Sequence, residues 1–413
     1  MCILYVAQGL PFGLFSVSIP SWLATQDYST AEVATFIGIA GLPWSFKFFA
    51  GPIMGRFSFL AMGHRRPWIL IAQLGIVASF ILLANVYPLV TSIYAVAMLG
   101  FLINFFCASQ DVAVDGMAIG VLENNERGRA NAFMFGGQLM GIAGGASGGS
   151  YLLNHFGMTE TALIGAAITL VIFLMPLLFK ERQSEKRFPW SQGVVTAEIA
   201  ALQIDRIAPM VGRLMAVLLV PLSLLLIATE ATSRLANGLL FAYLPTFTVQ
   251  DLGWADTVYN DCYPISNVIA AVVGIAFDPI VDRFGAAKVI AFASFTKAGL
   301  VLACAALPQL WGDTLWGGFI VIFVSAGQVF AIAIISTFMR ICSKQVAASQ
   351  FAIYMASSNL AFAGGALLLG AIGSIVSTTE ILLGLALVFA LVPFVFFAAS
   401  KKTSGRPEQA VAA

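Results

Sequence analysis

Charged side chains are scarce in this sequence of 413 residues: Asp, Glu, Lys and Arg together make up 10% of the chain, compared with about 25% in a typical soluble protein. Hydrophobic residues make up 60%, and the mean hydropathy is +0.92. This composition excludes a soluble globular protein. A net charge of +1 gives no indication of nucleic-acid binding. We therefore predict an integral membrane protein whose surface contacts a lipid bilayer and which binds no nucleic acid.

Cysteine and histidine are scarce as well. The five cysteines show no CxxC spacing and four of them lie in apolar runs, so we expect small buried residues and no disulfide framework. The two histidines, His64 and His155, are far apart in the chain and are predicted to lie on opposite membrane faces. We expect no metal site. The sequence also contains no phosphate loop of the Gly-x4-Gly-Lys type, which excludes ATP hydrolysis by that route.

Long apolar runs make up most of the sequence. A membrane-spanning helix needs about 20 mainly apolar residues, and twelve stretches of the chain meet that requirement. The sequence therefore predicts an all-α integral membrane protein with twelve transmembrane helices. Their predicted ranges are 2–24, 32–55, 67–86, 91–116, 130–153, 160–179, 213–247, 258–281, 288–307, 314–339, 345–375 and 379–399.

The basic residues are distributed unevenly along these spans. All but Lys47, Arg234 and Lys297 fall in connections after even-numbered spans or in the C-terminal tail. By the positive-inside rule, both termini and the longest connection lie in the cytoplasm. The predicted parts are an N-terminal six-helix bundle (1–179), a cytoplasmic central loop (180–212), a C-terminal six-helix bundle (213–400) and a disordered cytoplasmic tail (401–413). Residues 194–207 of the loop form either an interfacial amphipathic helix or a plain linker.

The two halves of the chain resemble each other. The segment Gly51–Phe57 parallels Asp278–Phe284, and Phe133–Gly145 parallels Ile353–Gly365, where each segment ends in a Gly-Gly pair. These matches indicate duplication of a six-helix unit, and carriers built in this way bind solute near the membrane midplane between their repeats. The four-residue spacing of Gly141, Gly145 and Gly149 predicts close helix packing.

Six plus six spans, with a basic loop after the second span and its repeat after the eighth, resemble the major facilitator superfamily. The loop signature of that family, Gly-x3-Asp-Arg-x-Gly, is approached by Asp282-Arg283-Phe284-Gly285, whereas Gly55 stands at the acidic position of the first copy. The resemblance implies two pseudo-symmetric bundles that rock against each other. Candidate residues of a cytoplasmic gate are Asp115, Arg56, Arg127, Arg129, Asp278, Asp282 and Arg283.

Four motifs in the first 140 residues resemble a narrower group, the peptide/acetyl-coenzyme-A transporters. They are Leu4–Leu14, Leu42–Phe48, Arg65–Trp68 and Ala108–Gly116. The group holds the AmpG-like muropeptide permeases, the acetyl-CoA transporters and related siderophore importers. The resemblance implies proton-driven uptake of a bulky, often anionic solute across a bacterial inner membrane. The proton gradient is then the energy source, and no cofactor is expected.

Two carboxylates one helical turn apart, Asp111 and Asp115, are the most informative charged residues. A carboxylate deep in a bilayer persists only when it faces protein or a wet cavity. Asp111 is either a proton-coupling group, because burial favours the protonated form of a carboxyl, or the structural ion-pair partner of Lys47. Asp115 lies closer to the cytoplasmic end, where a gate contact is the favoured interpretation.

Three cations lie within predicted spans. Lys47 is placed about 13 Å inside the membrane by helical rise, and it either binds an anionic solute or pairs with Asp111. Glu230 and Arg234 are four residues apart. They either form a pair on their own helix, or Arg234 clamps a solute carboxylate while Glu230 takes part in proton coupling. Lys297 is expected to snorkel towards the interface.

Uncharged polar and aromatic residues complete the candidate substrate site. Gln8, with Pro11 and Gly13, predicts a kinked first helix whose backbone is partly open to ligand. Trp44 is a candidate for the wall of the passage. The polar candidates, each of which could instead form an interhelical hydrogen bond, are Gln138, Asn237, Asn267, Gln328 and Asn359.

These observations predict a secondary active transporter for a small-molecule substrate, which we expect to be monomeric. The solute is an anhydro-muropeptide in the first interpretation, and a siderophore or acetyl-CoA in the alternative. A membrane-embedded enzyme would need a His, Cys or carboxylate cluster at one interface, and the sequence offers only the aspartate pair. A protein that senses its ligand without transport is the other alternative, and its one supporting feature is Gly55.

Overall fold

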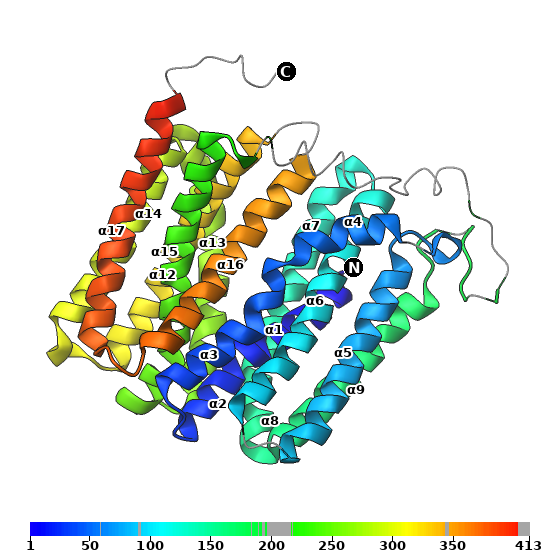
Figure 1. Cartoon of the computed structure of the whole chain (residues 1–413), viewed down its shortest axis with the longest axis horizontal. Coiled ribbons are helices and arrows are strands. Elements are labelled where there is room, and N and C mark those ends of the chain that lie inside the picture. Colours follow the sequence, from blue (N-terminus) through cyan, green and yellow to red (C-terminus); the bar gives the residue numbers. More distant parts are fainter. Residues whose placement is uncertain are drawn as a thin grey trace. The chain divides into compact units, whose positions relative to one another are not determined.

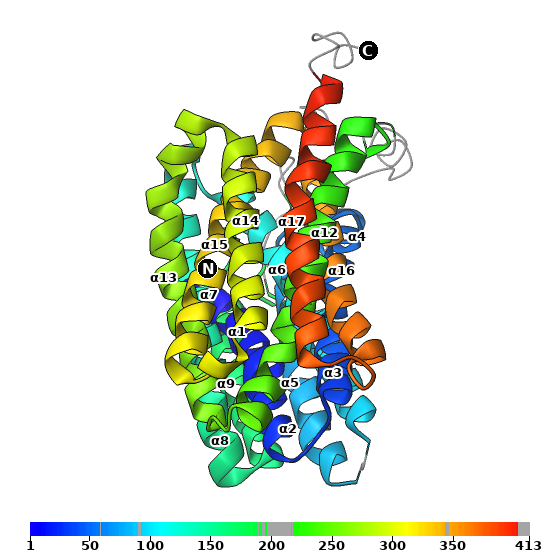
Figure 2. The same cartoon turned by 90° about the vertical axis from the view of Figure 1, so that its left-hand side faces the viewer.

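The computed structural model describes residues 1–57, 59–89, 92–182, 184–188, 190–191, 195, 216, 218–342 and 347–403. Within these residues the fold is all-α, without a strand (Figures 1 and 2). Ten helical segments are long and apolar enough to cross a membrane. Two more, at 124–156 and 221–251, bring the described long segments to twelve. The prediction of an all-α, multi-span membrane protein is confirmed.

The first six spans contain several interruptions. The first joins α1 (Cys2–Gly13), a π-helical turn (Leu14–Ser18) and α2 (Ile19–Thr25). The second joins α3 (Thr30–Gly41), a 3-10 turn (Leu42–Ser45) and α4 (Lys47–Arg56). The rest are α5 (Arg66–Val86), α6 (Ile93–Val121), α7 (Asn124–Ala143) continued through a π-helical turn (Gly144–Gly148) into α8 (Gly149–Phe156), and α9 (Met158–Leu178).

The last six spans are more regular. They are α12 (Pro221–Thr246) with a following π-helical turn (Phe247–Asp251), α13 (Asp256–Phe284), α14 (Ala286–Ala306), α15 (Asp313–Ile341), α16 (Ala347–Ile372) and α17 (Thr378–Thr403). α13 contains Pro264 and Pro279, and α17 contains Pro393. Both helices continue through these prolines.

The chain divides into two compact units. One contains Met1–Leu23 and Ile39–Ile207, and the other contains Ala24–Gly38 and Ala208–Ala413. Most of α3 therefore packs with the second unit, although the chain order places it in the first half. A Cβ added to Gly38 would meet the side chain of Leu367, and one added to Gly370 would meet that of Thr35. The absence of side chains at these glycines allows α3 to lie close against α16.

Glycines at two related helix pairs let backbones touch. In the first unit α1 packs against α7, and a Cβ at Gly145 would collide with the carbonyl oxygen of Leu10. In the second unit α12 packs against α16, and a Cβ at Gly365 would collide with the carbonyl oxygen of Leu235. The packing role predicted for Gly145 is confirmed. The two contacts occupy matching places in the repeated segments, as expected for a duplicated unit.

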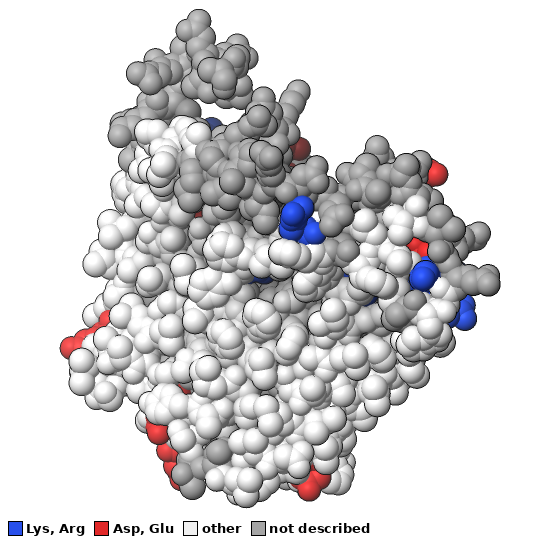
Figure 3. All heavy atoms as spheres, turned by 45° about the vertical axis from the view of Figure 1, so that its right-hand side comes forward, with Lys and Arg blue, Asp and Glu red and all other residues white. Residues whose placement is uncertain are grey.

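The flanks of the helices are apolar. Large hydrophobic side chains such as Phe105, Val171, Val272 and Phe394 are exposed, which in a soluble protein would form an unstable surface. The face drawn in Figure 3 is uncharged over most of its area, and Lys, Arg, Asp and Glu side chains are visible mainly towards the ends of the helices. This distribution suits a surface that contacts lipid tails along its length and water at its ends.

Three predicted ranges were wrong in detail. The span predicted at 32–55 is not one helix, because the chain turns through a 3-10 segment at Leu42–Ser45, where Pro43 removes a backbone donor. The fifth helix begins at Asn124 and not at residue 130, because Glu123 and Glu126 form a capping box. Residues 401–403 of the predicted disordered tail extend α17. The proposed amphipathic helix at 194–207 lies outside the described residues, apart from Val195.

Candidate functional site

Asp111 is held from two other helices of its unit. Its Oδ1 accepts a hydrogen bond from Gln8 Nε2 in α1 at 2.8 Å, and its Oδ2 lies 3.0 Å from Lys47 Nζ in α4. Only 5% of Asp111 is exposed, whereas 23% of the Lys47 side chain is exposed. The carboxylate is thus buried and charge-paired, and the cation that pairs with it remains accessible.

The break in the second span places Lys47. Because the 3-10 turn ends at Ser45, Lys47 becomes the first residue of α4. Its Nζ lies 5.7 Å from the centroid of the Trp44 ring, a distance at which a cation and an indole attract each other. Trp44 Nε1 in turn donates to Asn104 Oδ1 in α6 at 2.9 Å. A chain of polar contacts therefore links the turn to the helix that carries Asp111.

Asp115, one turn further along α6, accepts a hydrogen bond from the Tyr5 hydroxyl of α1. Directly before Asp111, Gln110 Nε2 donates to the carbonyl oxygen of Leu4 at 2.8 Å and its Oε1 accepts from Gln73 Nε2 at 3.0 Å. These contacts fasten α6 to α1 and α5. The gate contact of Asp115 stays a prediction, since the Arg127 side chain lies outside the described part of the chain.

The second unit contains a comparable cluster. Glu230 Oε1 lies 3.5 Å from Arg234 Nε on the same helix, and Ser358 Oγ of α16 bridges them, donating to Glu230 Oε1 at 2.7 Å and accepting from Arg234 Nε at 2.8 Å. The guanidinium also lies 5.5 Å from the ring centroid of Phe362. Glu230 is buried, whereas 37% of the Arg234 side chain is exposed. As at Asp111, an accessible cation covers a buried anion.

The other polar candidates have local roles in the described structure. Asn267 Nδ2 donates to the carbonyl of Tyr263 on its own helix at 2.9 Å, and Asn237 Nδ2 lies 3.5 Å from Ser233 Oγ, also on its own helix. Gln328 in α15 lies over Gly274 of α13. Gln138 and Asn359 are half-buried, in α7 and α16. Their part in binding solute stays a prediction.

The candidate gate residues of the second half lie at the end of α13. Asp282 Oδ1 is 3.8 Å from Arg340 Nη2, but both side chains are well exposed, so the pair contributes little stability. Arg283 lies over the ring of Phe284, and Asp278 is exposed. In the first half, Arg56 is exposed at the end of α4 and Arg129 lies 5.8 Å from the Phe133 ring centroid.

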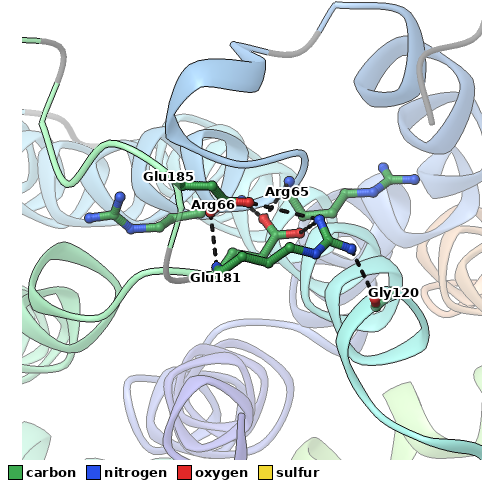
Figure 4. Close-up of polar contacts among 6 residues, drawn as sticks. Arg65, Arg66, Gly120, Glu181 and Glu185 are labelled. Atoms are coloured by element: carbon green, nitrogen blue, oxygen red, sulfur yellow. Dashed lines mark hydrogen bonds and ion pairs between the residues drawn. The ribbon is translucent and has the colours of Figure 1, made fainter. Parts of the chain in front are cut away.

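A cluster of charges at the start of α5 was missed by sequence reasoning (Figure 4). Glu181 Oε2 accepts hydrogen bonds from the backbone amides of Arg65 at 2.9 Å and Arg66 at 3.1 Å. Arg182 lies near both Glu181 and Glu185 and donates to the carbonyl of Gly120 at the end of α6. The signal that could have found it is the Arg65-Arg66 pair, placed where a helix begins.

The loop before this cluster depends on one glycine. Gly63 has a φ of 112°, and a Cβ there would approach the carboxylates of both Glu181 and Glu185. Burial lowers the pKa of the adjacent His64, and the nearby positive charge of Arg65 lowers it further. Burial likewise raises the pKa of Glu185. The cluster therefore combines tight backbone geometry with desolvated titratable groups.

Lys297 does not snorkel. It is fully buried within α14, and its amine faces the rings of Phe323, Phe330 and Phe389. The prediction failed because a sequence shows the distance of a residue from the end of its helix but does not show which side of the helix faces protein.

A separate cavity of about 300 Å³ is lined by Met1, Arg66 and Met117 among others. Neither Asp111 nor Lys47 lines it.

The long apolar helices define a multi-pass membrane protein, and its family and relatives show that it is a transporter. The chain matches the Major Facilitator Superfamily over residues 1–363, and it belongs to that superfamily. It is 25% identical over 363 residues to the anhydromuropeptide permease of Escherichia coli (strain K12), an alignment that covers 87% of this chain and 70% of that protein. It is 24% identical over 372 residues to the putative transporter AmpG 4 of Rickettsia felis, covering 87% and 85% of the two chains.

A third relative matches over a shorter length. An uncharacterized protein of Haemophilus influenzae is 30% identical over 177 residues, which is 42% of this chain and 41% of that protein. Among solved structures, the nucleoside transporter NupG aligns with a TM-score of 0.72 at 14% identity, covering 97% of this chain and 98% of that one. A bacterial homolog of the human lysosomal transporter Spinster, inward-facing and unoccupied, aligns with a TM-score of 0.73 at 14% identity, covering 99% and 97%. These structural likenesses show the fold.

Proposed function

We propose that this transporter imports an anhydromuropeptide across a bacterial inner membrane together with protons, with both termini in the cytoplasm. The observation that carries the proposal is the Asp111 cluster: a buried carboxylate paired to an accessible lysine, in a chain similar to the E. coli anhydromuropeptide permease over most of its length. An isolated charge is costly at membrane depth. Asp111 and Lys47 are therefore stable at this depth only while the charge of each is neutralised by the other or by another group.

Asp111 is the proton-coupling group in this proposal, and Lys47 binds an anionic part of the solute. When a solute carboxylate takes Lys47, Asp111 loses its counter-ion. The carboxylate can then remain buried only if it binds a proton, since burial favours the uncharged form. Solute binding and proton binding at the first unit thereby become linked without direct contact between solute and proton.

Arg234 and Glu230 repeat this arrangement in the second unit. The guanidinium has the planar geometry that binds a carboxylate with two parallel hydrogen bonds. Ser358, which now bridges the two charges, could continue to donate to Glu230 after Arg234 turns to the solute. Transport then proceeds by alternating access, with the buried charges neutralised before the halves close around the solute.

The experiment uses the full chain in proteoliposomes with a radiolabelled anhydromuropeptide. Wild type is expected to show counterflow without a gradient and accumulation when the outside is acidified. Asp111→Asn is expected to keep counterflow and lose accumulation, whereas the exposed control Glu160→Gln keeps both. Unchanged gradient-driven accumulation by Asp111→Asn would remove that residue from coupling. Counterflow of a CoA thioester or a ferric siderophore, with no counterflow of the muropeptide, would show that the substrate is that compound and not a muropeptide.

A further inference from the structure

The cavity of about 300 Å³ in the first unit is lined by residues of α1, α5, α6 and α9. Much of its wall is apolar, including Ile3, Met117, Met175 and Phe179. Ile3, Met175 and Phe179 are also exposed, so part of this wall is reached from outside the protein. Contact between apolar surfaces is favourable because it removes both from water. The apolar wall therefore suits a hydrocarbon chain.

The charged side of the same cavity is mainly basic. Among the described residues that line it, Arg66 and Lys180 are cations and Glu181 is an anion. Glu181 is already engaged, because its Oε2 accepts hydrogen bonds from the backbone amides of Arg65 and Arg66 (Figure 4). Only 2% of its side chain is exposed. An approaching anion therefore meets positive charge that this carboxylate balances only in part.

The guanidinium of Arg66 brings two more basic residues to this side of the cavity. Its Nη1 donates to the carbonyl oxygen of Lys186 at 3.0 Å, and its Nη2 donates to that of Arg187 at 2.9 Å. These contacts use the backbone of both residues and leave their side-chain charges in place. Arg187 is exposed. Basic side chains at a cytoplasmic membrane surface attract the head groups of anionic lipids.

An aromatic pair follows these basic residues. The rings of Phe188 and Trp190 stack, with centroids 5.3 Å apart and 8° between their planes, and 82% of Trp190 is exposed. Tryptophan is enriched where a bilayer meets water, because its ring is apolar and its N–H is polar. The segment next to the cavity thus carries the residue types that lie among lipid head groups.

We propose that this cavity binds one anionic phospholipid of the cytoplasmic leaflet, with an acyl chain against Met117 and Met175 and its phosphate near Lys180, Lys186 and Arg187. The leaflet follows from the proposed orientation of the termini, and the site is independent of the transported solute. Basic pockets between transmembrane helices on the cytoplasmic side are suited to anionic head groups. A bound lipid would stabilise the folded unit, because it contacts four of its helices at once.

The first test uses the full chain, purified in detergent and titrated with dioleoylphosphatidylglycerol or dioleoylphosphatidylcholine. Native mass spectrometry counts the lipids bound to each chain. We expect one phosphatidylglycerol to bind at least about tenfold more tightly than phosphatidylcholine and to raise the unfolding temperature. Arg187→Gln is expected to reduce this preference about fivefold. The control Lys288→Gln removes an exposed cation of the second unit and is expected to leave it unchanged. Equal affinity of the wild type for the two lipids would overturn the proposal.

A second pair of variants tests the place of the acyl chain. Met175→Trp fills part of the cavity, whereas Val171→Trp, one turn earlier in α9, changes an exposed residue that does not line it. We expect Met175→Trp to bind one phosphatidylglycerol fewer than wild type, and Val171→Trp to bind as many.

Three results of these measurements would contradict the lipid site. The first is an equal lipid count in Met175→Trp and Val171→Trp. The second is displacement of the lipid by excess sodium phosphate, which would indicate a site for a free anion. The third is a mass of two chains without lipid, which would assign the cavity to a second copy of the chain. No measurement here requires transport or a muropeptide, so failure of the proposed function would leave the result unaffected.

Discussion

Glu181 caps the start of α5, where Arg66 is the first residue, and Arg66 caps the end of α9, which lies just before Glu181 in the chain. Glu181 accepts the Arg66 amide at the start of α5, while Arg66 Nε donates to the carbonyl of Pro176 at 2.7 Å and Nη2 donates to that of Leu177 at 2.8 Å, at the end of α9. An anion at a helix start and a cation at a helix end both oppose the helix dipole. Only 1% of Arg66 is exposed. The contact joins the third and sixth spans of the first unit.

Arg66→Lys is therefore expected to destabilise the protein although it keeps the charge. The guanidinium donates to four carbonyls, of which two belong to Lys186 and Arg187, and an ammonium cannot reach all of them. Leaving buried acceptors unsatisfied costs about 2–4 kcal/mol in total. Thermal unfolding of the detergent-purified protein measures the change. The exposed Arg187→Lys is the control, and equal stability of the two variants would contradict the capping role.

Neighbouring glycines give a matched test of helix packing. Gly145→Ala places a methyl group against the Leu10 carbonyl, and Gly365→Ala does so against that of Leu235, whereas a Cβ at Gly144 or Gly364 would meet nothing within 4 Å. Overpacking against backbone costs about 1–3 kcal/mol. We expect Gly145→Ala and Gly365→Ala to lower the unfolding temperature, and Gly144→Ala and Gly364→Ala to leave it unchanged or raise it slightly. Equal effects within a pair would argue against close contact there.

Stability is expected to fall as the pH drops below about 6.5, the ordinary pKa of histidine. Burial and the charge of Arg65 lower the pKa of His64 in the folded protein. The unfolded chain therefore binds this proton at a higher pH than the folded chain does, and the difference penalises the folded state on acidification. The loss begins as the pH falls through the unfolded value and is complete below the folded one.

His64→Gln removes this proton-binding site and is expected to flatten the acid side of the stability profile. Glu185 contributes with the opposite sign, since burial raises its pKa and its cost to the folded state appears as the pH rises above about 4.5, its unfolded value. The comparison is therefore made between wild type and His64→Gln. Both proteins contain Glu185, so its contribution cancels. Parallel profiles from pH 7.5 to 5.5 would refute the role of His64.

The sequence could predict the features that repeat or follow a period. Apolar run length located the spans, and the four-residue glycine spacing predicted close helix packing at α7 but not that the partner is α1. The spacing of Glu230 and Arg234 predicted their ion pair as one of two alternatives. Arg66 could not be assigned, since its acceptors lie more than 100 residues away in sequence. The burial of Lys297 was missed for a related reason: three rings from two distant helices create it.

Lys47→Met tests whether the accessible cation binds solute or serves only to balance Asp111. Loss of one charge-assisted contact is worth about 1.5–3 kcal/mol, so the apparent affinity for an anionic muropeptide is expected to fall by at least about tenfold. Lys47→Arg retains a cation and is expected to restore most of that affinity. Counterflow measured over a range of muropeptide concentrations gives the KM, and unfolding temperature gives the stability.

A purely structural ion pair predicts a different outcome for the same variant. In that case Lys47→Met leaves Asp111 buried without its counter-ion, so stability falls while the KM of the remaining folded protein is unchanged. The double variant Lys47→Met with Asp111→Asn removes both charges and is expected to recover stability in either case. Its KM is the deciding quantity. A KM as high as that of Lys47→Met places the lysine in solute binding, and a wild-type KM confines it to balancing Asp111.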